Sequence, residues 1–201
     1  MELRDAHGLT ESEFLAQYKR KEYPRPSFTA DVAVFSNDGD GQPLVLMVRR
    51  GGHPFLGCWA LPGGFVNQDE DADTAAMREL LEETGVSEIK AEQLGVYSAP
   101  GRDPRGWTVS AAYLASVEGR IVAQAGDDAT EAVWCRLKTR VREDGLHDIE
   151  VHAGEDKLRV VFEVSEARCM PPRAHVLDSE GFAFDHAQIV ADAWLALSNG
   201  L

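Results

Sequence analysis

The stretch GFVNQDEDADTAAMRELLEETGV, residues 64–86, combines a loop led by glycine with a pattern typical of a helix. Residues 72–84 are mostly good helix formers, Asp71 stands before them as an N-cap, and Gly85 follows where a left-handed C-terminal cap belongs. A helix of this length extends for about 20 Å. The sequence therefore predicts a loop, a capped helix over 72–84 and a second loop.

Acidic side chains are concentrated in this stretch. Residues 69–83 contain seven acids and one base, which gives a local charge of −6. The acids are Asp69, Glu70, Asp71, Asp73, Glu79, Glu82 and Glu83. On a helix that turns by about 100° per residue, Glu79, Glu82 and Glu83 share one arc. The opposite side is apolar and consists of Met77, Leu80 and Leu81.

A solvated helix face explains these carboxylates poorly. Like charges at i and i+4, here Glu79 and Glu83, repel by about 0.2–0.5 kcal/mol, and acids late in a helix oppose its dipole. A divalent cation would remove both penalties. Because carboxylates without nearby His or Cys favour hard cations, we expect Mg²⁺ or Mn²⁺, which share their remaining positions with substrate phosphates. Ca²⁺ in a structural role is the alternative.

The spacing of the fixed residues resembles a known signature. Gly64, Glu70 and the run RELLEETGV at 78–86 match at every position the Nudix hydrolase pattern G-x5-E-x7-R-E-U-x-E-E-x-G-U, in which U is aliphatic. The resemblance implies the α/β class of fold, as an α/β/α sandwich with a mixed β-sheet and a loop-helix-loop metal site. It also implies cleavage of a diphosphate linked to a second group.

The same resemblance implies roles for individual residues. Metal ligands would be Glu79 and Glu83, with Glu82 directly or through water and the backbone carbonyl of Gly63. Arg78 and Glu70 would brace the loop against the helix. The catalytic set implied is Glu82, Glu79, Glu83, Arg78 and Glu70, with Mg²⁺ as cofactor or Mn²⁺ in its place.

The catalytic base stays open at this point. Glu82 is the candidate within the signature, and three acids of a distant loop are the alternatives: Asp127, Asp128 and Glu131. Histidine as a residue type suits proton transfer, which makes His53 and His186 candidates, but a lone histidine is more often structural.

Five further segments resemble the ADP-ribose pyrophosphatase-like branch and, equally, the Nudix-like domain of bacterial regulators of NAD metabolism. They are residues 23–26, 49–66, 101–106, 125–129 and 183–193. The resemblance implies hydrolysis of ADP-ribose to AMP and ribose 5-phosphate, and it implies a homodimer. The alternatives are hydrolysis of nucleotides or oxidised nucleotides, and an ADP-ribose sensor without catalysis. Because such regulators carry a winged-helix segment after this domain and the sequence ends at Leu201, we expect the enzyme.

Arginines supply the positive charge that a diphosphate needs. Arg102 and Arg105 lie in the loop APGRDPRG, and their forked guanidinium groups suit phosphate oxygens. Of Arg49 and Arg50, strand alternation allows one to face the site, and we expect Arg50. Three aromatic residues could stack on adenine or serve as ordinary packing: Tyr23, Phe55 and Trp107.

The remaining elements follow from hydrophobic periodicity and turn residues. We expect one domain over 1–201, with helices at 11–22 and 186–198 and strands at 28–36, 44–50, 93–98, 108–117, 132–135 and 158–164. Glycines and prolines predict loops at 51–57 and 62–64. Residues 139–157 are charge-dense and weakly patterned.

The closing helix has a well-marked start. Asp185 can cap it, Gln188 can return the bond, and Phe184 can pack on Ile189. Its expected buried stripe is Ile189, Val190, Ala193, Trp194 and Leu197.

Overall charge excludes several partners. The chain has 34 acidic and 20 basic residues and a net charge of −14, which argues against nucleic-acid and anionic-membrane binding and leaves a small-molecule nucleotide as partner. Without a signal peptide or an apolar span we expect a cytoplasmic protein. The cysteines, at 58, 135 and 169, form no metal-like pattern and are expected to be reduced.

Overall fold

The computed structural model describes residues 2–19, 22–119, 121–126, 129–167 and 170–200. In these ranges the helices are α1 (Glu11–Gln17), α2 (Ala72–Thr84) and α3 (His186–Ser198). The first strands are β1 (Ser27–Asn37), β2 (Pro43–Arg50), β3 (Trp59–Ala60), β4 (Gly63–Phe65), β5 (Glu92–Tyr97) and β6 (Thr108–Ser116). The later strands are β7 (Ala129–Val141), β8 (His147–Ala153), β9 (Asp156–Ala167) and β10 (Met170–Glu180).

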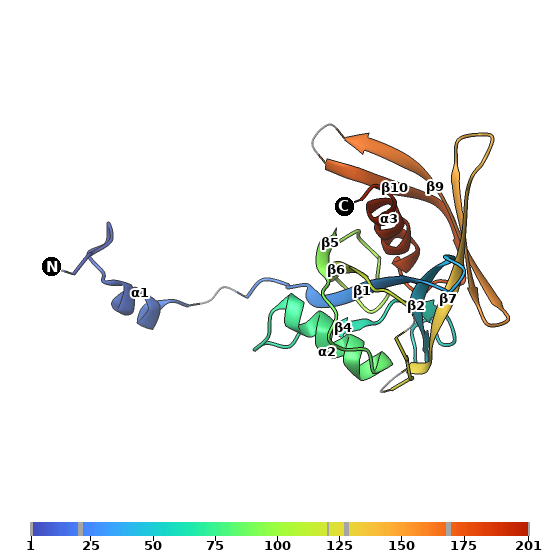
Figure 1. The fold of residues 1–201 in the computed structure, drawn as a ribbon. Coiled ribbons are helices and arrows are strands. Elements are labelled where there is room, and N and C mark those ends of the chain that lie inside the picture. Colours follow the sequence, from blue (N-terminus) through green and yellow to red (C-terminus); the bar gives the residue numbers. More distant parts are fainter. Residues whose placement is uncertain (1, 20–21, 120, 127–128, 168–169, 201) are drawn as a thin grey trace.

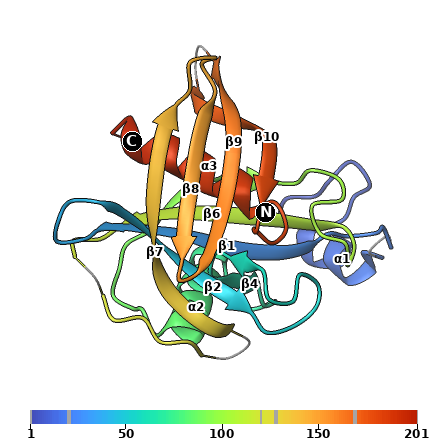
Figure 2. The same cartoon turned by 90° about the vertical axis from the view of Figure 1, so that its right-hand side faces the viewer.

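These strands form one mixed sheet. Its order is β10-β9-β8-β7-β2-β1-β6-β5, while β3 pairs with β2 and β4 pairs with β1. β1 and β6 are parallel, and the other pairs between described strands are antiparallel. Figures 1 and 2 show that the sheet curls, so that β8, β9 and β10 lie over α3. The predicted mixed sheet is confirmed.

The central strand β1 is buried on both faces. Its residues Thr29 to Ser36 are all buried, as expected for a strand between two covering layers. On one face Val32 and Val34 join the core beneath α2, and on the other Phe35 joins the core beneath α3. Figure 1 shows the two helices on opposite sides of this strand. The predicted α/β/α sandwich is therefore confirmed.

Helix α2 begins and ends where the sequence predicts. The Asp71 side chain accepts the Thr74 N–H at 2.8 Å, and Gly85 adopts a left-handed φ of 69° while its N–H bonds to the carbonyl of Leu81. Leu80 is fully buried, as the helical wheel indicates. Leu81 differs from the expected apolar side because it is 49% exposed.

Helix α3 has the predicted bounds, but its start is held differently. The stripe Ile189, Val190, Ala193, Trp194 and Leu197 packs into the core as expected. The predicted capping box is wrong: Asp185 binds Arg102 at 2.6 Å, and the Gln188 amide donates to the carbonyl of Ala174 at 2.7 Å. Phe184 packs against Phe55, with ring centroids 4.8 Å apart. At the start of α3, contacts with residues that are distant in the sequence therefore replace the predicted local contacts.

Three other expectations need correction. The first helix ends at Gln17 instead of residue 22, buries no side chain, and lies apart from the sheet in Figure 1. Residues 63–65 form the short strand β4 instead of a loop. Residues 139–157 contribute to β7, β8 and β9, and β10 was not expected at all. Among the described residues, no helix combines the length and apolar character needed to cross a membrane.

Candidate functional site

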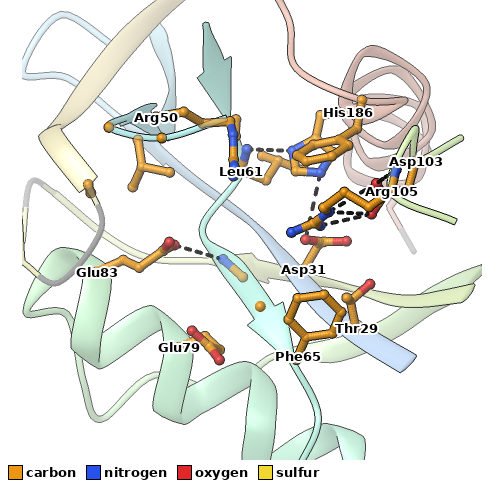
Figure 3. A pocket seen from close by; sticks show the side chains of 18 of the residues that line it. Thr29, Asp31, Arg50, Leu61, Phe65, Glu79, Glu83, Asp103, Arg105 and His186 are labelled. Atoms are coloured by element: carbon orange, nitrogen blue, oxygen red, sulfur yellow. Dashed lines mark hydrogen bonds and ion pairs between the residues drawn. The ribbon is translucent and has the colours of Figure 1, made fainter. Parts of the chain in front are cut away.

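A cavity of about 630 Å³ opens between α2 and the segment that leads into α3. It is lined from β1, β2, β4 and α2, by the loop between β5 and β6, and by residues at the start of α3. Figure 3 shows Glu79 and Glu83 projecting from α2 on one side, with Arg50, Arg105 and His186 across from them. Carboxylates and cations thus face each other over one space.

The first glycine of the signature allows a close approach to the helix. Gly64 lies on β4, and a Cβ atom there would stand 2.4 Å from the carboxylate carbon of Glu79. Any side chain would therefore displace Glu79 or the strand. Gly64 thus lets the strand backbone pass directly beside this carboxylate in its present position.

Glu83 is the most perturbed acid of the site. Its carboxylate accepts the N–H of Gly63 at 2.9 Å. Burial raises the pKa of Glu83 to about 8, and the charges of Glu79 and Asp31 act in the same direction, while the Gly63 N–H and Arg50 oppose the rise. A partly buried carboxylate among other acids is stabilised by added positive charge, so this side chain is suited to a cation.

Arg78 holds the loop against the helix. It binds Glu70 at 2.6 Å, Glu79 at 2.7 Å and Glu82 at 2.8 Å, and it donates to the carbonyl of Phe65 at 3.0 Å. The hydrogen bond from Arg78 lowers the pKa of Glu70 to about 2. The contact between Arg78 and Glu70 is the geometry that a bracing role needs.

The donor set fits a hard divalent cation in its chemistry. Glu79, Glu83 and Gly63 line the cavity, whereas Glu82 turns toward Arg78 and its side chain is 44% exposed. Within the described ranges, no three His, Cys, Asp or Glu residues stand together as a ligand set. The Glu79 carboxylate already binds Arg78. To bind a cation, it would have to share this bond between the arginine and the cation, or exchange one for the other.

The two arginines at the end of β2 face opposite ways, as strand alternation predicts. Arg50 lines the cavity, and its Nε donates to the carbonyl of Pro54 at 2.9 Å. Arg49 points elsewhere and binds Glu131 at 2.9 Å. The choice of Arg50 as the cavity-facing residue is consistent with this arrangement.

Arg102 and Arg105 also line the cavity, each paired with an acid. Arg102 is buried, with a side chain 4% exposed, and Asp185 binds it through two oxygens at 2.6 and 2.9 Å. Arg105 lies nearer the solvent, 42% exposed, and binds Asp103 at 2.8 Å. The buried Arg102 therefore helps to build the wall of the cavity, while Arg105 is accessible to a ligand.

Comparison with known proteins shows which family has this arrangement. A family model described as a NUDIX domain matches residues 27–151, well over half of the chain. The chain belongs to the NUDIX family. The resemblance of residues 64–86 to the Nudix signature is confirmed.

The relatives within the NUDIX family include a regulator and an enzyme. The chain is 38% identical over 141 residues to the "ADPR responsive transcriptional repressor NtrR" of Acinetobacter baylyi, covering 69% of this chain and 56% of that protein. It is 48% identical over 93 residues to an "ADP-ribose pyrophosphatase" of Methanocaldococcus jannaschii, covering 46% of this chain and 54% of that protein. The chain thus spans little more than half the length of these two relatives.

A solved structure supports the fold over nearly the whole chain. The NUDIX domain of Shewanella oneidensis NrtR, complexed with ADP ribose, superposes with a TM-score of 0.65 at 29% identity. The match covers 94% of this chain and 99% of that one.

Outside the NUDIX signature, the candidate bases have different surroundings. Asp127 and Asp128 lie outside the described residues. Glu131 is held by Arg49, and among the described residues it is not part of the cavity lining. His53 lines the cavity and is exposed.

His186 is structural. Its Nδ1 accepts the N–H of Leu61 at 2.8 Å, which places the proton of the neutral ring on Nε2, 3.7 Å from a carboxylate oxygen of Asp31. Burial lowers the pKa of His186. The neutral ring therefore fixes the loop before β4 and carries no charge into the cavity.

Asp31 is a site residue of this NUDIX domain that sequence reasoning missed. It lies on β1, is 5% exposed, and accepts a hydrogen bond from the hydroxyl of Ser110. Its carboxylate stands 3.8 Å from Arg102 and 3.7 Å from His186. A single acid inside the apolar run FTADVAVFS was the available signal, because a charge in a buried strand requires a partner.

The three aromatic residues considered for stacking on adenine lie in different environments. Tyr23 and Trp107 are exposed, at 65% and 59%, while Phe55 is partly buried and packs on Phe184. Phe184 lines the cavity, although its sequence context predicted a contact with Ile189.

Proposed function

We propose that this chain hydrolyses the diphosphate bond of a nucleoside diphosphate linked to a second group, with ADP-ribose as substrate. The observation that carries the proposal is the opposition of Glu79 and Glu83 to Arg50 across one cavity. In an acidic chain, an anionic ligand needs local positive charge from arginines and from a cation. The name of the Methanocaldococcus relative and the ADP-ribose complex of NrtR support the choice of substrate.

The residues have complementary tasks in this reaction. Glu79, Glu83 and the carbonyl of Gly63 would hold Mg²⁺, or Mn²⁺ in its place, with Glu82 reached through water. When bound, the metal supplies Lewis-acid chemistry and favours deprotonation of a water molecule. Arg50 and Arg105 would bind diphosphate oxygens and offset the charge that develops on the leaving phosphate.

The bond changes are those of a hydrolysis. The water oxygen bonds to one phosphorus, and the bridging oxygen leaves with the electron pair on the other phosphate. With ADP-ribose the products are AMP and ribose 5-phosphate. A carboxylate accepts the proton of the water: Glu82 in the signature, or Asp127, Asp128 or Glu131.

A second function is binding of ADP-ribose without hydrolysis, as a regulator. The similarity to NtrR over 69% of the chain favours it, and so does the bonding of Glu79 to Arg78. For either function we propose one domain, a small-molecule nucleotide as ligand, a homodimer, and no nucleic-acid contact by this acidic chain.

An assay with purified protein separates the two functions. The full chain is incubated with Mg²⁺ and, separately, ADP-ribose, NADH, nucleotide sugars or oxidised dGTP, and AMP or phosphate release is measured. We expect fastest turnover with ADP-ribose, loss of activity with EDTA and recovery with Mg²⁺ or Mn²⁺. Binding of ADP-ribose without turnover of any compound would refute the hydrolase and support the regulator. Turnover of oxidised dGTP alone would refute ADP-ribose as substrate.

A further inference from the structure

Phe184 lies between β10 and α3 in an unusual backbone conformation. Its φ is 52°, and the φ of Phe55, whose ring packs edge-on against it, is 61°. Residues other than glycine rarely adopt a positive φ, and for bulky residues it is rarer still. They keep this conformation only where contacts with the surrounding structure enforce it. Phe184 lines the cavity, so the strained residue stands at the proposed site and not in a distant turn.

Two cavity arginines lie against the Phe184 ring. The guanidinium carbon of Arg50 is 4.9 Å from the ring centroid, and that of Arg105 is 5.4 Å from it. Both distances fall within the range of cation–π attraction. Arg50 comes from β2 and Arg105 from the loop between β5 and β6, so one ring joins two arginines that are distant in sequence.

Other contacts fix the same two side chains from different directions. Arg50 donates through Nε to the carbonyl of Pro54, while Arg105 binds Asp103 and also lies 5.0 Å from the ring centroid of Phe65. A flexible arginine that is fixed in advance loses less conformational freedom when its ligand arrives. Removing the Phe184 ring would take one of these contacts away from both side chains at once.

The position of Arg50 ties this arrangement to the carboxylates of α2. Arg50 and Glu83 line the same cavity, and Figure 3 shows Arg50 across from Glu83. Arg50 is partly buried, whereas Arg105 is exposed, with 42% of its side chain accessible to solvent. A ligand with two linked phosphates can contact the first arginine inside the cavity and the second toward the opening.

We propose that Phe184 is a positioning residue that holds Arg50 and Arg105 for the two phosphates of a diphosphate ligand. The inference rests on the proposed function of the cavity. A role in packing alone explains the observations less well, because packing needs neither a strained backbone nor two guanidinium groups on one ring.

Inorganic pyrophosphate tests this inference as a probe with no base or sugar. Its Kd is measured by titration calorimetry in Mg²⁺ buffer for the full wild-type chain and for Phe184→Leu and Phe184→Tyr. We expect Phe184→Leu to raise Kd about tenfold, the loss expected for two cation–π contacts, and Phe184→Tyr to restore binding because it keeps the ring. With ADP-ribose, Phe184→Leu should raise KM more than it lowers kcat.

Two further variants control for folding. Phe28→Leu makes the same change at a 41% exposed ring outside the cavity lining and should leave Kd unchanged. Phe184→Gly removes the ring while relieving the positive φ, so it keeps the test decisive if Phe184→Leu does not fold. Thermal unfolding of each variant is recorded beside the titrations.

The outcomes separate this inference from the proposed function. Wild-type Kd in Phe184→Leu or Phe184→Gly, or no pyrophosphate binding by the wild type, overturns the role of Phe184 even if ADP-ribose is hydrolysed. Loss of binding in those variants with rescue by tyrosine supports it, even if the wild type hydrolyses no nucleotide and the proposed hydrolase fails.

Discussion

Helices α2 and α3 have the same length, and each follows an aspartate that the sequence marks as its N-cap, yet only α2 is capped as predicted. Asp71 accepts the N–H of Thr74 at 2.8 Å. Asp185 instead binds the buried guanidinium of Arg102 through both oxygens. A bidentate charged pair outcompetes a single capping bond, and a buried guanidinium must have such a partner.

The difference teaches where local sequence signals can be trusted. At α2, Glu79 and Glu83 line the cavity and the cap lies outside it, so local chemistry decides the helix start. At α3, residues at the start of the helix form part of the cavity wall. The side chains of Phe184 and Asp185 therefore contact residues from other segments. The following variants test this contrast.

The largest expected effect is at Glu83 on α2. Glu83→Gln removes the charge of the proposed metal ligand, and we expect kcat for ADP-ribose to fall by at least about a hundredfold. Folding should be intact or improved, because the neutral amide avoids the cost of a partly buried carboxylate among other acids. Turnover and thermal unfolding measure the two effects.

A matched variant controls this prediction. Glu92→Gln makes the same change at an exposed position at the start of β5, and it should alter neither activity nor stability. If Glu83→Gln retained wild-type activity, the assignment of Glu83 as a metal ligand would be wrong.

The next largest effect is expected at the start of α3. Asp185→Ala leaves the Arg102 guanidinium buried without its bidentate partner, which should lower the free energy of unfolding by about 3 kcal/mol. Urea denaturation measures this loss. Replacing Arg102 as well, in Arg102→Leu/Asp185→Ala, should recover part of the stability. If Asp185→Ala lost only as much unfolding free energy as a missing helix cap costs, the pair with Arg102 would not be the dominant contact of Asp185.

Much of the site was predictable because its signals are local. Residues 71–85 specify α2, its caps and the arc of acids, and alternation along β2 directs Arg50 rather than Arg49 to the cavity. These features depend on spacing within one element. The fold class followed from the same signature.

The parts that were missed depend on contacts between distant segments. Phe184 meets Arg50 and Arg105 only after the sheet has curled around α3. In β8, Ile149, Val151 and Ala153 are buried at alternate positions, but the buried Asp148 interrupts this alternation. Asp31 left a signal as a lone acid in an apolar strand, but its partners could not be read from the sequence.

A smaller effect is expected at the α2 cap. Asp71→Ala removes one hydrogen bond to Thr74 at an exposed helix start, so the loss of unfolding free energy should be well below that of Asp185→Ala. Urea denaturation of both variants in one buffer makes the comparison. Equal losses would mean that the two aspartates have equivalent roles, contrary to their different contacts.

The smallest effect is the pH dependence of that cap. Hydrogen bonds from Thr74 lower the pKa of Asp71 below its ordinary value of 3.8. A lowered folded-state pKa adds stability above the unfolded-state pKa, and this contribution is lost as the pH falls through the folded-state value. The stability gap between wild type and Asp71→Ala should thus be constant from about pH 7 to pH 5 and narrow toward about pH 3. Urea denaturation across this range measures it, and a gap that stays constant to the lowest pH would show that the charge of Asp71 adds nothing to the cap.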